Sequence, residues 1–114
     1  MTADPARIAL LEGWMRGKEG ENCEFKEATN RFDFELLGKY VCALANEGGG
    51  KMILGVTDAR PRRVVGTRAF DQPERTRKGL CEQIPLGIDF EEIAHPDGRV
   101  LVFHVPGRPV GTPM

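Results

Sequence analysis

The chain has 114 residues, 40% hydrophobic and 29% charged, so it has room for one compact core and not for two. Its formal net charge of −1 excludes a histone-like polycation, and any attraction to nucleic acid must come from a local group of charges. The three cysteines, Cys23, Cys42 and Cys81, form no CxxC pair, which favours a reducing cytoplasm over a disulfide framework. Near the N-terminus no apolar run approaches the length of a membrane span, so we expect neither secretion nor membrane insertion.

The first third of the chain predicts two helices around a short strand. Apolar residues at helical spacing predict a helix over 5–16 with Asp4 as its cap. Alternating apolar and charged residues predict a half-buried strand over 23–28, followed by a turn at 30–33. A broad apolar stripe then predicts a central, largely buried helix over 34–46.

Glycines and prolines divide the remainder into short elements. Gly48, Gly49 and Gly50 close the central helix. We then expect an interior strand over 52–56, a return strand at 64–65, a helix over 73–84, and strands over 88–94 and 99–105. The order αβαββαββ predicts an α+β domain over 1–114, with helices packed on one mixed sheet. The proline-rich tail after Val105 is expected to lead into further sequence.

One segment of the chain is strongly basic. Residues 60–78 contain seven basic and two acidic residues, a local charge of +5. A surface of this charge can neutralise phosphates, although a solvated surface loop explains the same residues. The candidate phosphate contacts are Lys26, Arg60, Arg62, Arg63, Arg68, Arg75, Arg77 and Lys78.

The glycine run before Lys51 does not have the order of a phosphate-binding loop. In such loops a strand precedes the glycines and a helix follows, so that the positive end of the helix dipole faces the anion. Here the predicted helix comes first, and its negative end would face the ligand. A helix cap with a tight turn is therefore the preferred interpretation.

Three carboxylates form a possible catalytic set. Glu19 and Glu24 flank the first predicted strand, and Asp58 follows the interior strand. If the two strands are neighbours, these side chains could hold Mg²⁺ or Mn²⁺ and activate water on a phosphodiester. Exposed glutamates and a turn-forming aspartate are the simpler explanation, which we favour, so we expect no metal and no cofactor.

Five sequence blocks resemble the Schlafen AlbA-like domain family when taken together and in order. The blocks are CEFKE, VCALANEGGG, KMILGVTD, RRVVG and VLVFHVPGRPVGTP. The family pattern is EFK, a helix ending in AFAN, GG, ILIGVDD, VVG and an ending of the form VLVIEVP…RPV. The resemblance covers about residues 19 to 113.

The resemblance implies a DNA-binding domain, typically N-terminal in bacterial transcriptional regulators and helicase-related proteins. It places Asn46, Gly48, Gly49, Gly55 and Asp58 in the family signature. In animal Schlafen proteins two glutamates and an aspartate act as nuclease residues, and Glu19, Glu24 and Asp58 occupy the matching positions. Those nucleases join two such domains.

We therefore expect a cytoplasmic DNA-binding module of a bacterial transcriptional regulator that contacts mainly phosphates, with RNA and a homodimer as further options. A metal-dependent endonuclease and a noncatalytic oligomerisation module are the alternatives.

Overall fold

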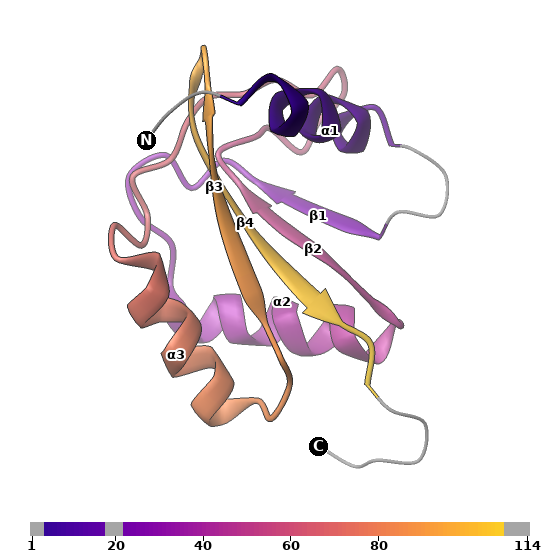
Figure 1. Ribbon diagram of the computed structural model, residues 1–114, viewed down its shortest axis with the longest axis vertical. Coiled ribbons are helices and arrows are strands. Elements are labelled where there is room, and N and C mark those ends of the chain that lie inside the picture. The colour runs from indigo at the N-terminus through magenta and orange to yellow at the C-terminus, as the bar shows by residue number, and fades with distance from the viewer. Residues whose placement is uncertain (1–3, 18–21, 109–114) are drawn as a thin grey trace.

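The computed structural model describes residues 4–17 and 22–108 and shows three helices around a four-stranded mixed sheet (Figure 1). The elements are α1 (Pro5–Met15), β1 (Cys23–Lys26), α2 (Phe34–Asn46), β2 (Gly49–Leu54), α3 (Pro73–Gln83), β3 (Asp89–His95) and β4 (Gly98–Pro106). The strand order is β1-β2-β4-β3; β1 is parallel to β2, and β4 is antiparallel to both of its neighbours. The predicted α+β class is confirmed.

Each of the first two helices has an aspartate as its N-cap residue. The Asp4 side chain accepts a hydrogen bond from the backbone N–H of Ala6, and Pro5 follows in the first helical turn. Asp33 accepts from the backbone N–H of Leu36 in the same way at the start of α2. The sequence therefore fixes where these helices start.

The sheet is covered on both faces. On one face α2 and α3 place Leu37, Leu80 and their neighbours against Phe103. On the other face α1 places Leu11 and Trp14 in a second apolar cluster. No helix within residues 4–17 and 22–108 is long and apolar enough to cross a membrane. In the central strand β2, Met52 and Leu54 are buried on one face and Ile53 on the other, as the continuous apolar run predicts.

Some predicted boundaries are wrong. The return strand at 64–65 is reduced to an isolated bridge between Val56 and Val64, so the observed order is αβαβαββ. The first strand ends at Lys26, because Ala28 has a φ of +44° and leaves the extended conformation. The strand expected over 52–56 runs instead from Gly49 to Leu54, since its first glycines pair with the long strand β4.

Three glycines allow backbones to cross closely beyond the end of the sheet. Gly55, Gly66 and Gly98 have φ values of +103°, +84° and +147°. A Cβ atom on Gly98 would lie 2.6 Å from the Gly66 Cα atom, and one on Gly55 would lie 2.8 Å from the carbonyl oxygen of Arg99. We call these three residues the glycine junction. It lets the segment after β2 pass directly against the β3–β4 turn.

A polar network connects α1 to β3, the strand at one edge of the sheet. Arg7 donates to both carboxylate oxygens of Glu91 on β3, and His104 Nε2 lies 2.7 Å from Glu91 Oε1. The Trp14 ring stands edge-on to the His104 ring at a centroid distance of 6.0 Å. Burial alone would raise the pKa of Glu91, but the hydrogen bonds from Arg7 and His104 outweigh it and hold that pKa below its ordinary value.

The glycine junction is tested by adding one methyl group. Gly98→Ala should lower the free energy of unfolding by about 2–4 kcal/mol, because the new Cβ meets backbone and the φ is unfavourable. Gly13→Ala is the matched control, since α1 leaves open space there; it should stabilise by about 0.5–1 kcal/mol. Urea unfolding measures both. Equal stability of the two variants would contradict the close crossing.

The Glu91 network predicts a pH dependence of stability. A carboxyl whose pKa is lower in the folded than in the unfolded state stabilises the fold above its unfolded pKa, and this contribution is lost as pH falls through the folded pKa. Wild type should therefore lose stability below about pH 4.5, the ordinary glutamate value. Glu91→Gln should be less stable at pH 7 and lose less on acidification. Urea midpoints at pH 7 and pH 3 measure the difference, and parallel pH profiles would contradict it.

Candidate nucleic-acid interface

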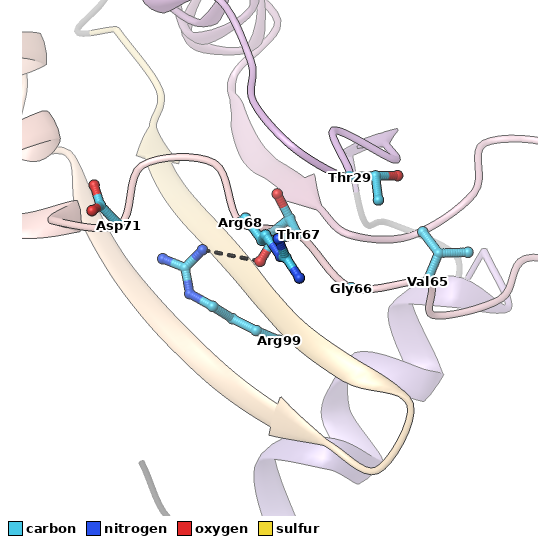
Figure 2. Close-up of a pocket in the computed structure, with 7 residues that line it drawn as sticks. All are labelled: Thr29, Val65, Gly66, Thr67, Arg68, Asp71 and Arg99. Carbon is cyan, nitrogen blue, oxygen red and sulfur yellow. Dashed lines mark hydrogen bonds between the residues drawn. The ribbon is translucent and has the colours of Figure 1, made fainter.

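An open pocket lies next to the glycine junction, between the loop after β1 and the segment before α3 (Figure 2). Its volume is about 580 Å³. It is lined by Thr29, Val65, Gly66, Thr67, Arg68, Asp71 and Arg99, and we call it the junction pocket. Figure 2 shows Thr29 and Val65 at one end, Asp71 at the other, and Arg68 and Arg99 between them.

Arg99 builds the floor of the junction pocket. Its guanidinium donates to the carbonyl oxygens of Ala69 at 2.8 Å and Phe70 at 2.9 Å, and more weakly to that of Thr67 at 3.3 Å. Its Nε donates to Glu92 at 2.8 Å. Arg99 thus fixes the backbone before α3, and its donors are used within the protein.

Strained backbone directly precedes two of the lining residues, Thr29 and Asp71. Ala28 and Phe70 are the two non-glycine residues with positive φ in residues 4–17 and 22–108, at +44° and +52°. The Thr67 hydroxyl donates to the Ala28 carbonyl, and Arg99 donates to that of Phe70. Such strain persists only where neighbouring bonds enforce it, and it is concentrated at functional sites.

A row of exposed cations extends from the pocket along the start of α3. Arg68 lies on the pocket wall. Arg75 and Lys78 line a neighbouring groove together with Glu92, the carboxylate that pairs with Arg99. We call Arg68, Arg75 and Lys78 the basic strip. Within the described part of the chain none of the three forms an ion pair, so their charges face solvent.

The other predicted phosphate contacts lie elsewhere. Arg60 and Arg62 line a separate pocket at the end of α1, where they donate to the carbonyl oxygens of Arg16 and Met15. The Arg62 guanidinium also lies 4.2 Å from the centre of the Phe25 ring. Arg63 is exposed on the same loop.

Arg77 lies on α3 but is engaged by a carboxylate. Its guanidinium pairs with Glu74 through both Nε and Nη2. This hydrogen bond raises the pKa of Arg77 and lowers that of Glu74. The structure therefore divides the basic segment 60–78 between opposite faces of the sheet and does not gather it on one surface.

Lys26 and two of the proposed catalytic carboxylates are near one another. Lys26 Nζ lies 5.2 Å from the centre of the Tyr40 ring, and a hydrogen bond to Tyr40 raises the pKa of Lys26. The charges of Glu24 and Asp58 act in the same direction. Glu19 lies outside the described residues. Among residues 4–17 and 22–108, no three His, Cys, Asp or Glu side chains are arranged to hold a metal ion.

The signature residues around the glycine run support the end of β4. Gly48 and Gly49 have φ values of +99° and +98°, and a Cβ on Gly49 would lie 2.7 Å from the backbone nitrogen of Gly107. The Asn46 side chain accepts a hydrogen bond from Arg108, and the Arg108 backbone N–H donates to the carbonyl of Ala45. The C-terminal end of α2, where an anion is disfavoured, faces this turn.

Sequence reasoning missed most of the junction pocket. Thr29, Val65, Thr67 and Arg99 carry no motif for ligand binding, and Arg99 is about 30 residues away from the carbonyls that it binds. The glycines before Thr67 and Arg99 were the available signal, because positive φ at both positions marks a close crossing of the chain.

The three helices and the mixed four-stranded sheet define an α+β domain of the AlbA-like fold. The chain belongs to the Schlafen, AlbA_2 family, whose model matches residues 19–112. One curated relative, an uncharacterized ATP-binding protein from Ureaplasma parvum, is 33% identical over 75 residues, which are 66% of this chain and 21% of that protein. The chain thus spans about a fifth of the length of this relative.

Two solved structures share the fold. The DIP2311 protein from Corynebacterium diphtheriae matches with a TM-score of 0.66 and 23% identity, over 92% of this chain and 27% of that one. The N-terminal domain of a protein related to the ATP-dependent DNA helicase RecG, from Nitrosomonas europaea, matches with a TM-score of 0.57 and 22% identity, over 96% and 76% of the two chains.

The different surroundings of Arg62 and Arg63 predict different effects of alanine substitution on the free energy of unfolding. Arg62→Ala should lower the free energy of unfolding by about 1–2 kcal/mol, because it removes a cation–π contact and a cation at the end of α1. Arg63→Ala, the exposed neighbour, should change it by less than about 0.5 kcal/mol. Thermal and urea unfolding measure both variants. A neutral Arg62→Ala would show that this side chain is available for a ligand.

Proposed function

We propose that this domain binds nucleic acid, with DNA as the principal target, through phosphate contacts made by the basic strip. The observation that carries the proposal is the position of Arg68, Arg75 and Lys78, three solvent-facing cations along one stretch of surface. Arginine and lysine at such positions bind phosphate oxygens and release counterions, whatever the base sequence.

The strip is favoured over Arg62, Arg77 and Lys26 for electrostatic reasons. Arg62 is half-buried against an aromatic ring, and Arg77 is paired with Glu74. Lys26 has two carboxylates nearby that would repel a phosphate. Of the carboxylates beside the strip, Glu74 and Glu92 are paired with Arg77 and Arg99, which reduces their repulsion of a phosphate. Asp71, which lines the junction pocket with Arg68, forms no ion pair within the described residues.

Membership of the Schlafen, AlbA_2 family agrees with this proposal. By the family resemblance, the domain would serve as the nucleic-acid-binding module of a bacterial transcriptional regulator. Little base reading is expected from phosphate contacts alone, so sequence selection in such a regulator would depend on other contacts.

The proposal is tested with a triple variant of the strip. Arg68→Ala/Arg75→Ala/Lys78→Ala should weaken binding to a DNA duplex and reduce the slope of log Kd against log salt concentration by about three, one for each lost phosphate contact. Fluorescence polarisation between 50 and 200 mM salt, a range of about fourfold, measures the slope.

The matched control removes the same charge elsewhere. Arg16, Lys39 and Arg63 are exposed at the C-cap of α1, on α2 and on the loop after β2. The triple alanine variant at these positions should retain most of the wild-type salt slope. If both triple variants lose affinity equally, binding follows overall charge and the strip is not the site.

A further inference from the structure

We infer that the junction pocket receives one nucleotide of a single-stranded nucleic acid, a substrate preference that rests on the proposed function and extends it. The basic strip accounts for attraction to any nucleic-acid backbone. The pocket beside it is large enough, at about 580 Å³, to hold more than a phosphate group.

The walls of the pocket present a mixed set of groups to a ligand. On the floor of the pocket, the Thr67 hydroxyl and the Arg99 guanidinium already form hydrogen bonds with backbone groups of the protein. In the described part of the chain, no hydrogen bond or ion pair occupies the Thr29 hydroxyl, the Arg68 guanidinium or the Asp71 carboxylate. Val65 is 36% exposed and adds an apolar side chain to the pocket lining.

These groups match the parts of a nucleotide. Arg68 and Thr29 are donors that suit phosphate oxygens. A carboxylate such as Asp71 only accepts hydrogen bonds and repels phosphate, so it suits the N–H or O–H groups of a nucleoside. Val65 offers an apolar surface to a sugar or a base. Because Asp71 and Thr29 lie at opposite ends of the pocket, a nucleotide can extend between them (Figure 2).

A duplex cannot use this arrangement fully. In a duplex the bases are stacked and their pairing edges are occupied, so the protein meets mainly phosphates and groove edges. An unpaired strand can turn one nucleotide into a pocket at much smaller cost. The hydrogen bonds from Thr67 to the Ala28 carbonyl and from Arg99 to the Phe70 carbonyl hold the backbone beside the pocket in place before a ligand arrives. The geometry therefore favours single strands.

The first experiment uses fluorescence polarisation to compare the affinity for a mixed-sequence DNA strand of about 20 nucleotides with the affinity for its duplex. This length spans a few protein footprints. Wild type should bind the single strand about tenfold more tightly. Thr29→Val/Val65→Ala changes the pocket without changing charge, and it should reduce this preference to about twofold or less while leaving duplex affinity unchanged. Leu36→Ala/Thr76→Val, a control outside the pocket, should behave as wild type.

The second experiment maps the site on the unaltered protein, which removes any dependence on the folding of variants. Titration with guanosine 5′-monophosphate should shift the backbone amide signals of Thr29, Val65 to Thr67 and Asp71 in ¹H–¹⁵N spectra. Signals at the pocket of Arg60 and Arg62 should stay in place.

The outcomes separate the two proposals. Equal affinity of wild type for strand and duplex, or equal loss of both in the pocket variant, would overturn the pocket inference and leave the basic strip intact. No binding of either DNA would overturn the proposed function. In that case nucleotide shifts confined to the junction pocket would still support a nucleotide site, and shifts elsewhere or none would overturn it.

Discussion

The close crossing at Gly55, Gly66 and Gly98 is the constraint on which the junction pocket and its surroundings depend. Without Cβ atoms at these positions, the segment after β2 passes against the β3–β4 turn. Arg99 directly follows Gly98, so the crossing places its guanidinium beneath the next stretch of backbone. There it satisfies carbonyl groups that have no strand partner. The junction pocket is the space that this arrangement leaves open.

Charge alone did not decide which arginines face solvent. The Met15 carbonyl at the end of α1 attracts Arg62, and the carbonyls of the crossing segment attract Arg99. A guanidinium can satisfy several such acceptors at once, so its use inside the protein depends on nearby unpaired carbonyls. Arg75 and Lys78 lie on an α-helix whose carbonyls are already bonded, which leaves their charges available.

The sequence predicts those features that depend on local order. The helix over 34–46 has the predicted bounds, because Asp33 caps it and glycines follow it. The central strand is shifted, since its ends are set by pairing with β4 and not by its own residues. The junction pocket could not be predicted: it depends on contacts between Ala28, Thr67 and Arg99, which are distant in sequence.

The two glycine-rich places in the chain have opposite electrostatic characters. The run Gly48–Gly50 follows the C-terminal end of α2, and Arg108 already binds the adjacent Asn46 side chain. Carbonyl dipoles there disfavour an anion. The glycine junction lies instead beyond the carboxyl ends of the parallel strands β1 and β2, the end at which open sheets commonly bind ligands. In the proposed function a phosphate would therefore meet Arg68 at this end of the sheet, whereas at the other end Gly49 allows the close approach of the Gly107 backbone.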